Sequence, residues 1–203
     1  MDNYQIQAQQ AKRRFLGYDQ VRLIEKLRLK YDEAYLYTVL FSSEHRISRS
    51  TGDISRLEDG GWVSADSHAE VLTLLDLVCD SREDRHPAFR WRSMADFGLR
   101  FHQDLSDTGA DRRALAFQRD PEGLRRALET LGGRPIPQGD VAYAVKIFED
   151  LELAVQFWDG DEDFPPKIRY LWDENALMYL KYETMYYAVG LLLRRIDCLM
   201  AGR

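Results

Sequence analysis

Two neighbouring segments of alternating hydrophobicity constrain this sequence more than any other feature. In the first, residues 141–148, one side carries Val141, Tyr143, Val145 and Ile147. In the second, residues 151–158, one side carries Leu151, Leu153, Val155 and Phe157. Successive side chains of a strand point to opposite faces of a sheet, so this period of two predicts two β-strands. Only two residues separate the segments, which favours an antiparallel β-hairpin with Val145 and Val155 in the core.

Other segments extend the prediction to the α+β class. Residues 34–41 are rich in β-branched and aromatic side chains, residues 45–50 can return antiparallel to them, and residues 167–172 form a third candidate strand near the hairpin. Apolar residues at helical spacing alternate with these strands. We therefore expect an α+β fold in which antiparallel β-hairpins form a sheet with flanking helices, the last of which covers one face of the sheet. The organisation that we expect is an N-terminal helical arm at residues 1–30 and a single compact domain at residues 31–203.

Local signals mark where three of the helices begin. Asp19 and Asp120 are suitable N-cap residues, and Pro121 after Asp120 fits the first helical position. Ser67 and Glu70 have the spacing of a capping box, in which each side chain satisfies a backbone N–H of the other residue. The glycine pair at residues 132–133 predicts a helix end.

The charge distribution argues against a nucleic-acid partner. The 203 residues are 45% hydrophobic, enough for a folded core, and carry a net charge of −6. Residues 1–30 hold seven basic and three acidic residues, a net charge of +4, so the remainder carries −10. An acidic body repels phosphate, and we interpret the basic segment as a solvated helix face whose Lys and Arg stems cover apolar surface.

The cysteines and the apolar runs favour a cytoplasmic protein. Cys79 and Cys198 lie in apolar helical patterns, which predicts buried small side chains rather than a disulfide. The first residues lack the apolar stretch of a signal peptide, and the apolar run at residues 186–193 is too short to span a bilayer. We expect no membrane insertion.

The usual signatures of catalysis are missing from the sequence. It contains no G-x-S-x-G nucleophile motif, no P-loop and no G-x-G-x-x-G, and neither cysteine has a catalytic context. The histidines, His45, His68, His86 and His102, have no metal-binding spacing. The residues alone therefore do not decide whether the protein is an enzyme.

One acidic loop is the candidate metal site. Residues 158–166 read WDGDEDFPP, and the four acids are Asp159, Asp161, Glu162 and Asp163. The spacing matches the first three ligands of an EF-hand loop, but Phe164 stands where glycine is needed and Tyr170 where glutamate is needed. A looser divalent-metal site is one interpretation. The other is a structural loop with Trp158 and Phe164 buried and the four acids in water, because crowded carboxylates resist burial.

The order of these motifs resembles an uncharacterised family, domain of unknown function 3786, over most of the chain. The matching elements are Gly132-Gly133-Arg134-Pro135, Gly139-Asp140, the loop from Trp158 to Pro165, and Leu171-Trp172-Asp173. The chain departs from the family pattern at Trp172, where the family has Phe, and at Asp163, where it more often has Glu.

The resemblance implies a fold and a prokaryotic setting but no established activity. Some relatives carry the domain behind a cysteine-rich iron–sulfur module, which suggests redox or corrinoid partners; two cysteines cannot hold such a cluster here. We therefore expect a non-enzymatic binding or accessory module with a protein partner, or a homo-oligomer. The alternative is an enzyme that uses a divalent metal ion at Asp159, Asp161, Glu162 and Asp163.

Overall fold

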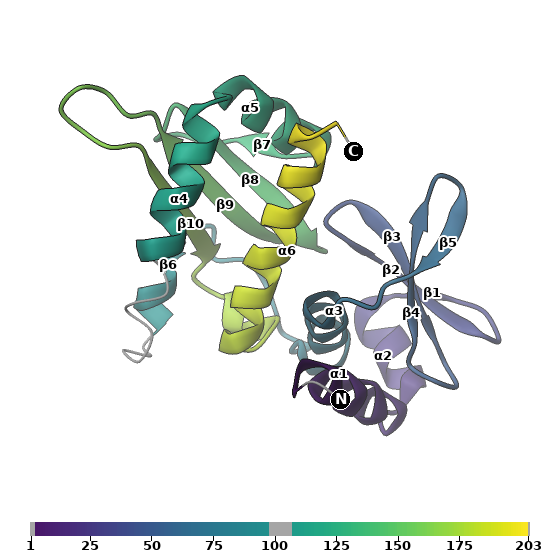
Figure 1. Cartoon of the computed structure of the whole chain (residues 1–203). Coiled ribbons are helices and arrows are strands. Elements are labelled where there is room, and N and C mark those ends of the chain that lie inside the picture. Colours follow the sequence, from purple (N-terminus) through teal and green to yellow (C-terminus); the bar gives the residue numbers. More distant parts are fainter. Residues whose placement is uncertain (1–2, 98–106, 203) are drawn as a thin grey trace. The chain divides into compact units, whose positions relative to one another are not determined.

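The computed structural model of the chain describes residues 3–97 and 107–202 and has an α+β fold, which confirms the predicted class. Its strands form two antiparallel five-stranded sheets rather than one. Internal contacts divide the chain into two compact units. Unit 1 consists of Met1–His86, Ile147–Glu149 and Leu177–Leu191. Unit 2 consists of Pro87–Lys146, Asp150–Ala176 and Leu192–Arg203 (Figure 1). The division into an arm at residues 1–30 and one domain at 31–203 stays a prediction.

Unit 1 contains the first sheet and the first three helices. The helices are α1 (Asn3–Leu16), α2 (Gln20–Leu27) and α3 (His68–Asp80). The strands are β1 (Lys30–Tyr31), β2 (Tyr35–Leu40), β3 (Ser43–Ser48), β4 (Ile54–Glu58) and β5 (Gly61–Ser64). Each strand pairs with the next along the chain, so the sheet is a simple meander in the order β1-β2-β3-β4-β5.

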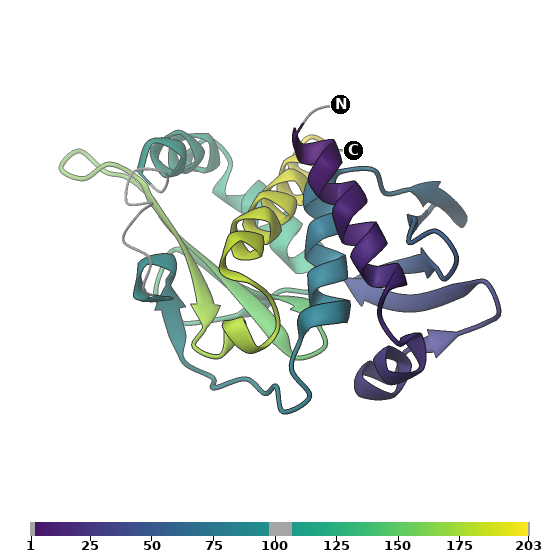
Figure 2. The same cartoon turned by 90° about the horizontal axis from the view of Figure 1, so that it is seen from below.

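Helix α1 packs along helix α3, as Figure 2 shows. It buries Ala8, Ala11 and Phe15, which recur at helical spacing and so lie on one face. Helix α3 is apolar on nearly every side, and its leucines and valines are almost completely shielded from water. An all-round apolar helix of this kind is suited to the centre of a unit, where it can be covered from several sides.

Unit 2 contains the second sheet. Its strands are β6 (Trp91–Ser93), β7 (Arg134–Pro135), β8 (Val141–Phe148, which ends in unit 1), β9 (Leu151–Trp158) and β10 (Lys167–Asp173), in the order β6-β10-β9-β8-β7. Its helices are the 3-10 helix η1 (Met94–Phe97), α4 (Asp107–Gln118) and α5 (Pro121–Thr130). The short 3-10 helix η3 (Ala176–Met178) and the last helix α6 (Tyr182–Met200) each begin in one unit and end in the other.

The predicted hairpin is confirmed residue for residue. Strands β8 and β9 are neighbours in the sheet, and a two-residue link permits only an antiparallel pair. Val145 and Val155 have no exposed surface. Helix α4 and the unit-2 end of α6, where Ile196 is fully buried, lie over one face of this sheet (Figures 1 and 2).

Two of the three predicted helix starts have the expected caps. The Asp19 carboxylate accepts hydrogen bonds from the backbone N–H of Val21 and Arg22, and Asp120 accepts one from Gly123. Helix α3 does begin after Ser67, but the Ser67 side chain makes no capping hydrogen bond, so that half of the predicted capping box is wrong. The Glu70 carboxylate binds the side chains of His45 and Arg56 in the sheet.

The two cysteines lie in different environments. Cys79 is buried in helix α3, as predicted. Cys198 is exposed, so its predicted burial is wrong. Its position in α6 lies outside the apolar face of the helix. Within residues 3–97 and 107–202, no helix has the length and apolar character needed to cross a membrane.

Candidate functional site

The acidic loop presents its four carboxylates to water. Asp159, Asp161, Glu162 and Asp163 are all exposed, as the structural interpretation of the loop predicted. Two of these acids hold the loop's own backbone. Asp161 Oδ1 accepts hydrogen bonds from the N–H groups of Asp163 and Phe164 at 2.9 and 2.8 Å, and Asp159 Oδ1 accepts one from Gly160 at 2.9 Å. The loop is thus a self-bonded turn of the kind that Asp side chains stabilise.

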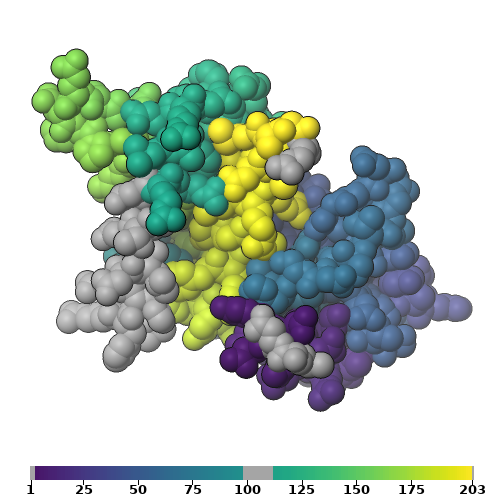
Figure 3. Space-filling view, viewed as in Figure 1, coloured from purple at the N-terminus to yellow at the C-terminus, as the bar shows by residue number. Residues whose placement is uncertain are grey.

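The predicted burial of the loop's aromatic residues is wrong for Phe164. Its side chain is 71% exposed, and Trp158 is half-buried with the Arg169 guanidinium 5.3 Å from its ring centroid. Figure 3 shows the reason, since the light-green loop projects from unit 2 beyond the neighbouring helix α4. Only its base can be covered. There Pro166 is buried and the Gln118 side chain donates a hydrogen bond to the carbonyl of Gly160 at 3.1 Å.

The metal interpretation of this loop stays a prediction. Among the residues that the structure describes, no three His, Cys, Asp or Glu side chains are grouped as ligands for a metal ion. His102 lies outside the described residues. His68 is placed between two aromatic rings, stacked on Tyr4 at 4.4 Å and edge-on to Tyr187 at 5.6 Å between centroids.

The Gly139-Asp140 motif ties the acidic loop to the sheet. Asp140 Oδ2 accepts a hydrogen bond from the Asp159 N–H, and the Asp140 N–H donates to the carbonyl of Phe157, both at 2.8 Å. Gly139 has a φ of +122°, and a Cβ atom there would lie 2.9 Å from the Phe157 carbonyl oxygen. A side chain is therefore excluded by both conformation and space. This motif therefore has a structural role in holding the start of the acidic loop against the sheet.

The Leu171-Trp172-Asp173 motif is also structural. Trp172 has no exposed surface, and Asp173 is only 4% exposed. The Asp173 carboxylate accepts three backbone N–H bonds, from Ala88 and Asn175 at 2.8 Å and from Phe89 at 2.7 Å. A buried carboxylate is stable only with such donors, so Asp173 fixes the segment that leads into β6.

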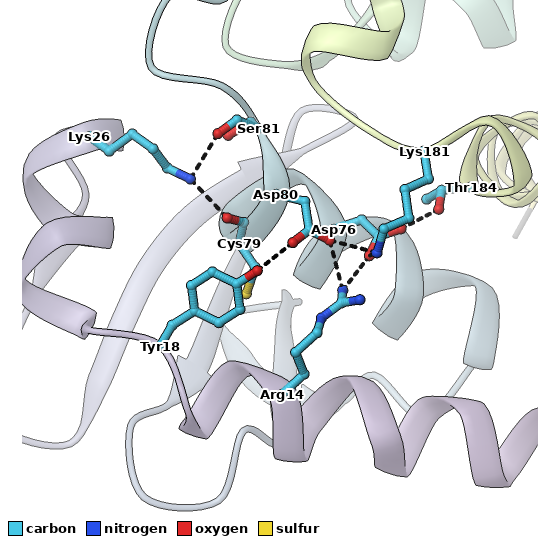
Figure 4. Close-up of polar contacts among 9 residues, drawn as sticks. All are labelled: Arg14, Tyr18, Lys26, Asp76, Cys79, Asp80, Ser81, Lys181 and Thr184. Atoms are coloured by element: carbon cyan, nitrogen blue, oxygen red, sulfur yellow. Dashed lines mark hydrogen bonds and ion pairs between the residues drawn. The ribbon is translucent and has the colours of Figure 1, made fainter.

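A cluster of ionised side chains surrounds helix α3 in unit 1 (Figure 4). Asp76 and Asp80 are four residues apart and so share one face of the helix. Arg14 of α1 contacts Asp76 at 2.5 Å and Asp80 at 3.0 Å, and Lys181 contacts them at 3.1 and 2.7 Å. The Thr184 hydroxyl donates to the second oxygen of Asp76. Two carboxylates thus face two cations.

Further contacts extend this cluster along the end of helix α3. The Tyr18 hydroxyl donates to Asp80 Oδ1 at 2.5 Å, and burial together with this bond raises the pKa of Tyr18 to about 12. Lys26 donates to the carbonyl oxygens of Cys79 and Ser81, both at 3.0 Å. A cation at the C-terminus of a helix is favourable because that end carries partial negative charge. Burial, followed by the negative charge of Asp80, raises the pKa of the Cys79 thiol to about 12, so this thiol is not a ready nucleophile.

We call this cluster the α3 network. It contains residue types that occur in active sites, but its acids are paired with cations and hold segments of the chain together. A catalytic base must reach its substrate. Only 6% of the Asp76 side chain is exposed, which is too little for that role. Each carboxylate already contacts both cations, which leaves neither acid unpaired. The sequence reasoning missed the network, although two acids four residues apart in an otherwise apolar helix were a signal for it.

A second buried ion pair joins helix α3 to the first sheet. His45 has no exposed surface; its Nε2 lies 2.9 Å from Glu70 Oε1 and its Nδ1 lies 2.9 Å from the Ser43 carbonyl oxygen. Both ring nitrogens thus have a hydrogen-bond acceptor within reach. Arg56 donates to the same Glu70 oxygen at 2.5 Å. Burial opposes ionisation of Glu70, but the hydrogen bonds from His45 and Arg56 outweigh it and lower its pKa to about 2.

A protein-family model matches the part of the chain that contains the motifs described above. It matches residues 19–195 and describes a domain of unknown function (DUF3786). The chain belongs to the DUF3786 family. No curated protein and no solved structure matches the chain. The matched range includes Asp76, Asp80 and Lys181 but begins after Arg14 and Tyr18, so Arg14 of α1 and Tyr18 of the link after α1 join the α3 network from outside it.

The loop should depend on its base rather than on its exposed ring. A Cβ atom at Gly160 would lie 2.7 Å from Pro166 and 2.9 Å from Gln118. We expect Gly160→Ala to lower the free energy of unfolding by about 1–3 kcal/mol, as overpacking does. Phe164→Ala, which removes an exposed side chain, should change it by less than about 0.5 kcal/mol. Urea melts of both variants measure the difference; a larger loss for Phe164→Ala would contradict the described loop.

The α3 network should stabilise unit 1 mainly through Asp76. Asp76→Asn leaves Arg14 and Lys181 with one shared carboxylate instead of two, and we expect a loss of about 3 kcal/mol, typical of a broken buried ion pair. The matched control is Asp84→Asn, because Asp84 pairs with Arg82 on the surface, where both side chains are more than half exposed. This control should lose far less stability than Asp76→Asn, because water screens an exposed pair. Equal losses in urea melts would show that the network contributes nothing beyond a surface pair.

The Glu70 ion pair should make the protein acid-sensitive. The pKa of Glu70 is about 2 in the folded protein and 4.5 in its ordinary state, so its stabilisation is complete above pH 4.5 and is lost as the pH falls through 2. The shift corresponds to roughly 3 kcal/mol. Glu70→Gln cannot titrate and should be less stable at pH 7, with a flatter dependence on pH. Urea melts from pH 5 to pH 2 test this; parallel curves for the two proteins would refute it.

Proposed function

We propose that this DUF3786 protein is a non-enzymatic binding module that recognises a protein partner through the outer face of its first sheet. The supporting observation is a cluster on that face, Tyr35, Tyr37, Arg46 and Trp62, which we call the aromatic–arginine cluster. Catalysis is less well supported, because the buried acids are paired with donors inside the protein and both ring nitrogens of His45 face acceptors there.

Strand register places the four side chains together. Tyr37 lies opposite Arg46 in the pairing of β2 with β3, and Trp62 lies opposite Leu57 in the pairing of β4 with β5. Leu36 and Ile47 belong to the other face of the sheet and are fully buried. Since side chains alternate along a strand, the cluster is on the face that the core does not use.

The cluster holds a cation between aromatic rings. The Arg46 guanidinium carbon lies 4.1 Å from the Tyr35 ring centroid and 4.6 Å from that of Trp62, and the Tyr37 and Trp62 rings are 6.0 Å apart. Within the described part of the chain, Arg46 makes no ion pair, and its shielded Nε has no hydrogen-bond partner. The stacked rings restrict the guanidinium while its charge is left without a bonded carboxylate.

Tyrosine, tryptophan and arginine are the residues enriched at the energetic centres of protein interfaces. A preformed group of them loses little conformational freedom on binding, which favours affinity. We infer that the partner brings a carboxylate to Arg46. Redox and corrinoid proteins are the partner class that the family resemblance suggests, and they are the first to test.

A single-stranded nucleic acid would also stack on aromatic rings, but the charge argues against it. Glu44 is exposed on the same face of the sheet, opposite Val39, and Asp32 accepts a hydrogen bond from the Tyr37 hydroxyl at 2.6 Å. The chain as a whole carries −6. Nucleic-acid sites need the opposite balance, because phosphate contacts dominate their affinity.

The alternative function, a metal-dependent enzyme that uses Asp159, Asp161, Glu162 and Asp163, stays a prediction. The fact in its favour is that all four side chains face solvent, where a divalent ion has access. Two of these carboxylates, however, already accept hydrogen bonds from backbone N–H groups of the loop.

The binding proposal is tested with the wild-type protein and matched variants. Proteins retained from a lysate of the source cells by immobilised wild type, Arg46→Ala, Trp62→Ala and Val21→Ala are identified, and binding of the purified partner is measured by calorimetry. Val21 is 58% exposed on α2, away from the cluster, and is the control. We expect Arg46→Ala and Trp62→Ala each to weaken binding at least about tenfold, while Val21→Ala has no effect.

Three results would contradict the proposal. If wild type and the three variants retain the same partner proteins equally, the aromatic–arginine cluster is not the binding site. Retention of the chain's own copies alone, with a matching mass in sedimentation, would make the face a homo-oligomer contact. If the protein binds a single-stranded oligonucleotide and Trp62→Ala abolishes this binding, the ligand of the cluster is nucleic acid rather than protein.

A further inference from the structure

Phe89 is an exposed aromatic residue on an unfavourable backbone. Its side chain is 83% exposed, the largest value among the exposed large hydrophobic residues of the described chain. Its φ is +56°, in the left-handed region. Residues with a Cβ atom rarely adopt this conformation, and for a bulky side chain it is a true outlier. Glycine at this position would make the same turn without strain and without an exposed ring.

The backbone at Phe89 is held by the buried Asp173. The Phe89 N–H donates to one carboxylate oxygen at 2.7 Å and the Ala88 N–H to the other at 2.8 Å. The Glu174 N–H donates to the carbonyl of Arg90, the residue after Phe89, at 2.8 Å. The buried carboxylate and these hydrogen bonds together hold the backbone of residues 88–90 in place. Strained residues persist where the surrounding structure holds them in this way, and they are often at functional positions.

The exposed charged side chains beside Phe89 in unit 2 are mainly arginines. Arg90 and Arg92 share the single carboxylate of Glu174, each with a closest approach of 2.6 Å. The two arginine side chains remain 66% and 48% exposed. The buried Asp173, together with Glu174, balances the two arginines in total charge, so the charge that remains accessible here is that of the two exposed guanidinium groups.

We propose that Phe89 is the anchor of a protein–protein interface whose partner is an acidic protein with an apolar pocket edged by carboxylates. A rigidly held aromatic ring fills a pocket at little entropic cost, and the arginines beside it match negative charge at the pocket's edge. This interface is formed by unit 2 residues and does not depend on the aromatic–arginine cluster of unit 1, so either proposal can fail alone.

The first experiment places a photo-crosslinking phenylalanine analogue, p-benzoylphenylalanine, at position 89 or position 164. Phe164 is the matched control, because it is also exposed, at 71%, but lies beside the acids of the loop. The full chain is irradiated in its source cells and the products are identified by mass spectrometry. We expect position 89 to give one dominant adduct with an acidic protein that position 164 does not give.

The second experiment measures the affinity of the purified adduct partner for variants. Phe89→Gly removes the ring and relieves the backbone, so it should keep or raise the melting temperature while raising Kd by about 30-fold or more. Phe89→Asn, which also tolerates this backbone, is the second variant should the first misfold. Arg90→Glu should raise Kd through charge, and Phe164→Ala should leave it unchanged.

Several outcomes would overturn the proposal. These are no adduct at position 89 above the level at position 164, an adduct only with a second copy of the chain, and a partner without an acidic surface. Unchanged affinity of a folded Phe89→Gly or Phe89→Asn variant would also overturn it.

Discussion

Buried carboxylates with complete sets of donors are the interactions on which the rest of this structure depends. Glu70, Asp76 and Asp173 are each no more than 4% exposed. Leaving any of them unpaired would be costly, because an ionised group loses its water without compensation. Each acid therefore dictates what surrounds it. Glu70 requires His45 and Arg56, Asp76 requires cations from other segments, and Asp173 requires three backbone N–H groups.

The same constraint explains how the DUF3786 motifs act. Asp140 and Asp173 lie in the motifs that gave the resemblance, and both accept hydrogen bonds from backbone N–H groups. Side chains used in this way orient segments of chain. The groups that remain available to other molecules are instead exposed aromatic rings and arginines, the aromatic–arginine cluster in unit 1 and Phe89 in unit 2. Both proposals for function therefore concern recognition rather than catalysis.

The α3 network shows how a charged cluster can have a structural role. Arg14, Lys181 and Thr184 come from positions distant in the sequence and meet at Asp76. A general base needs access to substrate and a partner-free lone pair, and Asp76 has neither. Through Arg14 it ties α1 to α3, and the cost of leaving a buried charge unpaired opposes their separation.

The sequence by itself determined the features that depend on neighbouring residues. The period of two in residues 141–158 gave the hairpin, and Asp19 and Asp120 gave the helix starts, because these signals act over a few residues. Only the tertiary structure decided which distant groups meet. Glu70 binds His45, 25 residues away, and Phe164 stays in water because its loop projects beyond the unit that would cover it. Burial depends on what the rest of the chain brings to a position, and no local pattern contains that information.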